Sequence, residues 1–155
     1  MSSFQIIVGS MLGTAEYVAE ACEEQLNILN HKVDLHLKPN FSSILEATLS
    51  EDHSQKNIWL LCTSTHGAGD FPDNIQAFMK DLKNCEQDLS SISFIIIAIG
   101  DSNYDTFCKA GKDLNKLLLT KGCREITSIK TMDMSQEIDP EDLAQHWLSQ
   151  NKDLL

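Results

Sequence analysis

No apolar run in this 155-residue sequence is long enough to cross a membrane, and no basic segment precedes an apolar one at its N-terminus. We therefore expect no signal peptide, no membrane anchor and a cytoplasmic location. Basic residues are also scarce: 12 Lys and Arg stand against 23 Asp and Glu, so the formal net charge is −11. This charge argues against nucleic acids and anionic membranes as partners, because both select basic surfaces. It suits a protein partner with a basic face, or it serves solubility alone.

Cysteine pairs with metal-binding spacing are absent as well. The five cysteines are odd in number and no two have CxxC spacing, so the sequence predicts neither a disulfide framework nor a zinc site. The five histidines form no HxxxH or HExxH pattern. Buried, reduced thiols are the simplest interpretation of the cysteines. No Ser-His-Asp or Cys-His arrangement is evident along the chain, although a triad assembled in space would not show there.

Stretches of strand length alternate with helical patterns. The strands are expected at 4–8, 32–38, 58–62, 92–99 and 124–132. The first, third and fourth are mostly apolar at consecutive positions, as in parallel strands that are buried on both faces. The second alternates strictly between polar and apolar residues, and the fifth is more polar. We therefore expect these two strands at the edges of the sheet.

Apolar residues at 3.6-residue spacing predict five helices. They are expected at 15–29, 41–49, 75–82, 107–118 and from 140 onward, with a polar connection at 50–56. We expect Asp73 or Asn74 to cap the third helix and Thr106 to cap the fourth. Asp139, followed by a proline, predicts the start of the fifth helix, and Gly122 predicts the end of the fourth.

This alternation predicts an α/β fold: a doubly wound, five-stranded parallel sheet with strand order 2-1-3-4-5 and helices on both faces. The sequence has no internal repeat, low-complexity tract or linker, so we expect one domain over residues 1–155. All loops that lead from a strand to a helix open at the same edge of such a sheet. That edge is where open α/β folds bind ligands.

The loop at 10–15 leads into a helix N-terminus, where backbone N–H groups and the helix dipole favour a phosphate. Ser10 and Thr14 add hydroxyl donors, and Gly13 permits close approach of the backbone. The loop lacks the Gly-Lys-Ser/Thr ending of a Walker A loop and the dinucleotide pattern GxGxxG. In isolation, a tight turn and a helix cap would explain it equally well.

Two further loops each carry one ring. His66 stands in the loop at 64–74, and Tyr104 stands in the loop at 100–108. Taken alone, each has a simple explanation, as a solvated histidine or as a tyrosine that packs on its own loop. An anion site and two rings at one crevice together predict a site for a phosphorylated planar heterocycle.

The three loops, at 9–16, 63–70 and 100–108, resemble those of the flavodoxin family, in order and each after the expected strand. The resemblance covers essentially the whole chain. It implies a flavodoxin-like fold, FMN bound without a covalent link, and one-electron transfer. It also implies cofactor-binding roles for Ser10, Met11, Leu12, Gly13, Thr14, Ala15, Ser64, Thr65, His66, Gly67, Gly100, Asp101, Asn103, Tyr104, Phe107 and Cys108.

By resemblance, residues 10–15 would hold the phosphate, largely through backbone N–H groups. Residues 64–67 would line one side of the flavin ring, and the loop at 100–108 would line the other side with Tyr104 stacked. The family's phosphate loop often has hydroxyl side chains where Met11, Leu12 and Ala15 stand here, which predicts weaker FMN binding.

The resemblance further implies a monomeric electron carrier rather than a stand-alone enzyme. A flavodoxin reductase would supply the electrons to it, and an acceptor enzyme, with biotin synthase as one candidate, would receive them. A response-regulator receiver is rejected, because its acidic pair and phospho-acceptor Asp would replace Gly9-Ser10 and Thr63-Ser64. A flavin-free interaction module with the same fold and a stand-alone enzyme such as a quinone reductase remain as alternatives.

Overall fold

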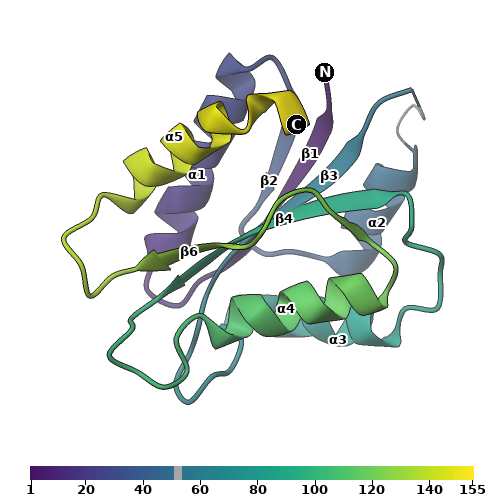
Figure 1. Ribbon diagram of the computed structural model, residues 1–155. Coiled ribbons are helices and arrows are strands. Elements are labelled where there is room, and N and C mark those ends of the chain that lie inside the picture. The colour runs from purple at the N-terminus through teal and green to yellow at the C-terminus, as the bar shows by residue number, and fades with distance from the viewer. Residues whose placement is uncertain (51–53) are drawn as a thin grey trace.

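The computed structural model describes residues 1–50 and 54–155 and shows, over these residues, a parallel sheet covered by helices on both faces (Figure 1). The strands are β1 Ser3–Gly9, β2 Lys32–His36, β3 Asn57–Ser64, β4 Ile92–Gly100, β5 Arg124–Glu125 and β6 Lys130–Asp133. The helices are α1 Thr14–Ile28, α2 Phe41–Ser50, α3 Gln76–Asn84, α4 Lys109–Thr120 and α5 Pro140–Gln150, with 3-10 turns η1 Asp73–Ile75 and η2 Lys152–Leu154. None of these helices is long and apolar enough to span a bilayer.

The strands lie in the order β2-β1-β3-β4-β5, every pair is parallel, and β6 also pairs with β4. The predicted order 2-1-3-4-5 is therefore confirmed. The strand β1 is buried along its whole length, whereas the edge strand β2 is only half-buried. That contrast follows from their sequences, because continuous apolar runs suit central strands and alternating runs suit an edge.

The prediction of one continuous strand at 124–132 is wrong, because two separate strands, β5 and β6, are found there. Residues 124 and 125 pair with Ser93 and Phe94, and the ladder resumes where Lys130 pairs with Ile97. The edge thus advances five residues (130 − 125) while β4 advances three (97 − 94). The two extra residues cannot fit into a regular ladder, so they separate β5 from β6.

Residues that are in register on neighbouring strands form rows across the sheet, and successive rows point to opposite faces of the sheet. Ile6, Leu60 and Ile95 are in register and belong to the core beneath α1 and α5. The next row, Ile7, Leu61 and Ile96, belongs to the core that α2, α3 and α4 cover. Figure 1 shows these two helical layers on opposite sides of the sheet. The alternation is the period-2 geometry of a strand, so both faces of each central strand are apolar.

Several predicted helix ends are confirmed. The Asp139 side chain accepts a hydrogen bond from Asp142 N at 3.1 Å, and Pro140 is the first residue of α5. Gly122 has φ +89° just beyond α4, as a glycine that ends a helix requires. The helix expected at 41–49 is α2, and the one expected at 15–29 is α1. Of the polar connection expected at 50–56, residues 51–53 lie outside the described part of the chain.

Two predicted caps are wrong. The helix α3 begins at Gln76 after the turn η1, and neither Asp73 nor Asn74 caps it. The helix α4 begins at Lys109, after Cys108 in the left-handed region, so Thr106 does not cap it. In both places a longer turn precedes the helix, and a capping residue read from the sequence alone falls too early.

Asn74 instead joins three segments. Its Oδ1 accepts a hydrogen bond from Ser10 N at 2.9 Å, and its Nδ2 donates to Val8 O at 2.7 Å and to Leu37 O at 3.0 Å. One side chain thus connects the ends of β1 and β2 to the start of α3. It satisfies backbone groups that the sheet leaves unpaired where β1 ends.

We expect Asn74→Ala to lower the free energy of unfolding by about 1–3 kcal/mol, because Ser10 N–H and two carbonyls lose their partner. Urea denaturation followed by circular dichroism measures this change. The matched control is Asn84→Ala at the exposed end of α3, for which we expect a change within about 0.5 kcal/mol. Equal effects of the two substitutions would contradict the joining role of Asn74.

Candidate functional site

A cavity of ≈ 560 Å³ opens at the carboxyl edge of the sheet. The ends of the central strands coincide there, since Gly9 pairs with Thr63 and Ser64 pairs with Ile99. The loops that follow these strands therefore start side by side. The lining residues are Ser10, Met11, Leu12, Thr14, Ser64, Thr65, His66, Gly67, Ile99, Gly100, Asp101, Tyr104, Thr106, Phe107, Cys108 and Met134.

Most residues singled out in the sequence line this cavity, and three do not: Gly13, Ala15 and Asn103. Ala15 is fully buried in the core beneath α1. Gly13 has φ +95° and shapes the turn before α1, and Asn103 N donates to Asp101 Oδ1 at 2.9 Å. These positions shape the loops without facing the cavity.

Sequence reasoning missed Ile99, Thr106 and Met134. Ile99 is the last apolar residue of β4 and looked like core. Met134 follows β6, and its N–H donates to Gly100 O at 2.7 Å, which holds it beside the loop after β4. Met134 could have been predicted from the parallel topology, because the loop after the last strand reaches the same edge of the sheet as the other loops.

The first loop presents hydrogen-bond donors. Ser10 Oγ accepts from Gly13 N at 2.9 Å, which closes the turn before α1. Gly13 at the N-cap has no side chain that could accept from the first turn of α1. The N–H groups of that turn have no acceptor within the helix, and the helix dipole makes this end positive. With the Thr14 hydroxyl on the cavity wall, this end of the cavity suits an anion.

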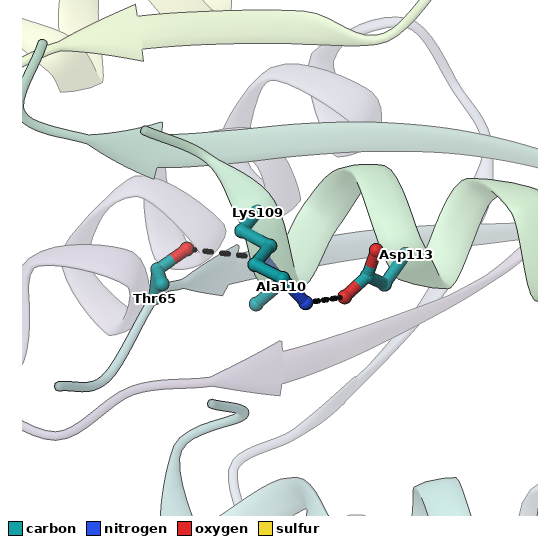
Figure 2. Close-up of polar contacts among 4 residues, drawn as sticks. All are labelled: Thr65, Lys109, Ala110 and Asp113. Carbon is teal, nitrogen blue, oxygen red and sulfur yellow. Dashed lines mark hydrogen bonds and ion pairs between the residues drawn. The ribbon is translucent and has the colours of Figure 1, made fainter. Parts of the chain in front are cut away.

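The second loop is a closed hairpin. His66 N donates to Asp70 O and Asp70 N donates to His66 O, both at 2.8 Å. Gly67, at the tip, has φ +54°, and a Cβ added there would touch nothing within 4 Å. Figure 2 shows how the loop is attached: Thr65 Oγ1 accepts a hydrogen bond from Ala110 N in the first turn of α4, at 3.1 Å.

The third loop folds back against β4. A Cβ at Gly100 would lie 2.9 Å from Cys108 N and 3.0 Å from Cys108 Sγ, so the chain approaches there as only glycine permits. Tyr104 is 69% exposed on the cavity rim and does not enter the core. Burial raises the pKa of the Cys108 thiol to about 11, so this cavity residue is a neutral thiol at pH 7.

Asp133 ties the third loop to the segment after β6. Its Oδ1 accepts hydrogen bonds from Ser102 N and Ser135 N, each at 3.0 Å, and from Ser135 Oγ at 2.7 Å. The hydroxyls and backbone amides of these two serines lower the pKa of Asp133 well below its ordinary value. The carboxylate therefore stays charged while it holds Met134 at the cavity.

The residues present fit a phosphorylated planar ligand. Donors from α1 and its preceding turn stand at one end, and the apolar or aromatic side chains of Met11, Ile99, Tyr104, Phe107 and Met134 line the rest. The volume lies in the range of small-molecule and cofactor sites. Gly100 lines the cavity at a point where a Cβ would clash with Cys108, so the chain can pass there only without a side chain.

Fold and site together define a flavodoxin-fold protein with its ligand cavity at the carboxyl edge of the sheet. The chain belongs to the flavodoxin family, whose model, described as Flavodoxin, matches residues 6–147. Family membership implies a flavin cofactor. The predicted family resemblance is thereby confirmed.

Within the family the chain is close to the protein MioC, which the runs Ser-Thr-His-Gly-Ala-Gly-Asp and Tyr-Asp-Thr-Phe-Cys resemble. It is 40% identical to Protein MioC homolog of Pasteurella multocida over 145 residues, 94% of this chain and 92% of that protein. It is 37% identical to Protein MioC of Escherichia coli K12 over 155 residues, 100% and 99% of the two chains. A solved structure of a Flavodoxin mutant from Pseudomonas aeruginosa, with one cysteine replaced by alanine, superposes with a TM-score of 0.86 at 27% identity, over 99% and 98% of the chains.

We expect Asp133→Asn to lower the melting temperature at pH 7 by a few degrees, because the amide is a weaker acceptor for the two serines. The folded-state pKa of Asp133 is depressed, so its contribution is present above the ordinary value of 3.8 and is lost as the pH falls below it. Melting curves at pH 7, 5, 4 and 3 should show the difference from wild type shrinking below about pH 4.

Asp153→Asn, at an exposed position in η2, is the control and should leave the curves unchanged. A pH-independent difference for Asp133→Asn would contradict the role given to its charge.

Proposed function

We propose that the protein binds FMN non-covalently in this cavity and carries single electrons from a reductase to an acceptor enzyme, as one domain over residues 1–155. The supporting observation is that the uncapped N-terminus of α1, which suits an anion, and aromatic side chains line the same cavity at the carboxyl edge of the sheet. A site for a bare phosphate would need only the first of these features, and a site for an uncharged ring only the second.

In this proposal the backbone N–H groups of residues 11, 12, 14 and 15 and the hydroxyls of Ser10 and Thr14 hold the phosphate, while Gly13 N keeps its bond to Ser10 Oγ. His66 and Gly67 flank the ring on one side, and Tyr104 stacks on the other. Asp101, Phe107 and Cys108 complete the wall beyond Gly100. Bound FMN would supply the redox chemistry, and the protein supplies binding, orientation and electrostatics.

The charges around the cavity support transfer of one electron at a time. Asp101 lines the cavity, and Asp70 and Asp105 stand in the loops that form it. These carboxylates disfavour a gain of negative charge inside, so the second electron should enter at a lower potential than the first. Gly67 supports the same conclusion, because its open surroundings let the neighbouring peptide reorient at little steric cost.

The first loop also carries a departure from the family pattern. Met11 is 41% exposed and Leu12 is 96% exposed on the cavity rim, where hydroxyl side chains are common in flavodoxins. These side chains donate no hydrogen bond to a phosphate. We therefore propose that the backbone of α1 carries most of the phosphate binding and that the affinity for FMN is modest.

An electron carrier rather than a stand-alone enzyme suits a member of the flavodoxin family. The net charge of −11 favours partners with basic faces, such as a flavodoxin reductase, over nucleic acids or membranes. Biotin synthase is the acceptor that the similarity to MioC suggests. The five cysteines are free thiols, which suits a monomer in the reducing cytoplasm.

We expect the purified wild-type protein to be yellow, or to become so when FMN is added, with quenching of FMN fluorescence at one equivalent. Stepwise reduction should then proceed in two one-electron steps at separate potentials. A colourless protein that takes up no FMN would favour the alternative, a flavin-free interaction module with the same fold.

Removing the exposed ring should weaken binding. We expect Tyr104→Ala to reduce FMN affinity by about 1–3 kcal/mol, the magnitude for stacking of a planar base on an aromatic side chain. Fluorescence titration measures the dissociation constant. Tyr104→Phe keeps the ring and should bind FMN nearly as well as wild type. Unchanged affinity in Tyr104→Ala would remove Tyr104 from the site.

A further inference from the structure

The loop after β3 is fixed at its base and open at its tip. Thr65 and Gly69, at the base, are half-buried and buried, whereas Gly67 and Ala68, at the tip, are exposed. The paired hydrogen bonds between His66 and Asp70 close the hairpin within this base. Gly69 N also donates to His66 O at 3.2 Å, so within this loop only the peptide between Gly67 and Ala68 makes no backbone hydrogen bond.

Thr65 attaches one side of the base to α4. Its hydroxyl oxygen accepts from Ala110 N, the second residue of the helix, at 3.1 Å (Figure 2). Cys108, the N-cap residue of α4, makes no side-chain capping bond, so the cap comes from a residue more than forty positions away. A hydroxyl in this role satisfies a helix amide that has no partner inside the helix.

Lys109 attaches the other side of the base. A Cβ built on Gly69 would lie 2.5 Å from Lys109 Cδ and 3.3 Å from Thr106 Cγ2, so the aliphatic stem of Lys109 lies directly over Gly69. Figure 2 shows the ammonium group of Lys109 bound to Asp113 one turn along α4. That ion pair holds the end of the stem.

The place of Lys109 is unfavourable for the helix itself. A cation in the first turn opposes the helix dipole, and a lysine four residues before an acid is the weaker order for such a pair. The pair is also partly exposed, and exposed pairs contribute little to stability. The favourable interaction that Lys109 makes here is the packing of its aliphatic stem against Gly69.

We propose that Thr65 and Lys109 are positioning residues that lock the base of this loop to α4 and confine any rearrangement to its Gly67–Ala68 tip. The inference rests on the proposed function, because the locked loop forms one wall of the FMN site. Lys109 does not line the cavity and acts through Gly69. Both FMN affinity and the gap between the two one-electron potentials then depend on the Thr65–Ala110 hydrogen bond and on the packing of Lys109 against Gly69, although only Thr65 of these residues lines the cavity.

The test uses two matched pairs of variants in the full chain. Thr65→Val removes the hydroxyl and keeps the shape, and Thr65→Ser restores the hydroxyl. Lys109→Ala removes the stem, and Lys109→Met keeps a stem without the charge. Amide hydrogen exchange at His66 and Asp70 is measured by NMR without FMN, relative to Leu60 in the central strand β3. The dissociation constant and the two potentials are then measured with FMN.

In Thr65→Val and Lys109→Ala we expect the amide hydrogens of His66 and Asp70 to exchange about tenfold faster than in wild type. We also expect both variants to bind FMN about five- to tenfold more weakly. Both effects follow from the loss of one hydrogen bond or packing contact. The gap between the two potentials should change in the same two variants. Thr65→Ser should stay close to wild type in every measurement, and Lys109→Met, which keeps the stem but loses the ion pair with Asp113, should fall between wild type and Lys109→Ala.

Unchanged exchange in Thr65→Val, or equal behaviour of the valine and serine variants, would overturn the proposal. The proposal would also be overturned if amide exchange became faster in Thr65→Val and Lys109→Ala while their FMN affinity and the two potentials stayed unchanged. A wild-type protein that fails to bind FMN would defeat the proposed function instead. The exchange pattern would then still show whether Thr65 and Lys109 lock the loop.

Discussion

Burial of β1, β3 and β4 on both faces is the constraint on which the rest of the structure depends. Each strand places successive side chains in two apolar cores, one beneath α1 and α5 and the other beneath α2, α3 and α4. A shift by one residue would exchange the faces of every side chain in a strand, so the register is strongly specified. Because the register is fixed, the three strands end together and their loops meet around one cavity.

Single polar side chains then fix each loop to a neighbour. Asn74 joins the first loop to the segment before α3, Thr65 joins the second loop to α4, and Asp133 joins the third loop to the segment after β6. In each case a side-chain oxygen accepts a backbone N–H that regular secondary structure leaves unpaired. The cavity is thus formed by backbone that is held in place, which is what binding of a rigid cofactor requires.

The sequence was sufficient to predict the structural features that depend only on neighbouring residues. Apolar runs identified the central strands, alternation identified β2 as an edge, and the Asp139-Pro140 start of α5 needs only neighbouring residues. It failed where the partner is distant. Asn74 and Thr106 looked like caps because their residue types suit caps. Asn74 instead bonds to Val8 in β1 and to Leu37 just after β2, and Thr65 from the second loop caps α4. The break between β5 and β6 depends on how their residues are paired with β4, where the edge segment has two residues too many, and no local pattern records this register.

The central claim is that FMN lies among these three loops. Titration of the ¹⁵N-labelled protein with FMN, followed by amide chemical shifts, tests it most directly. The largest changes should fall on Leu12, Gly67 and Tyr104 and on their neighbours in the three loops. Amides of Glu20 and Glu141, in the acidic groove between α1 and α5, should not move. Changes centred on that groove, or none at all, would contradict the account.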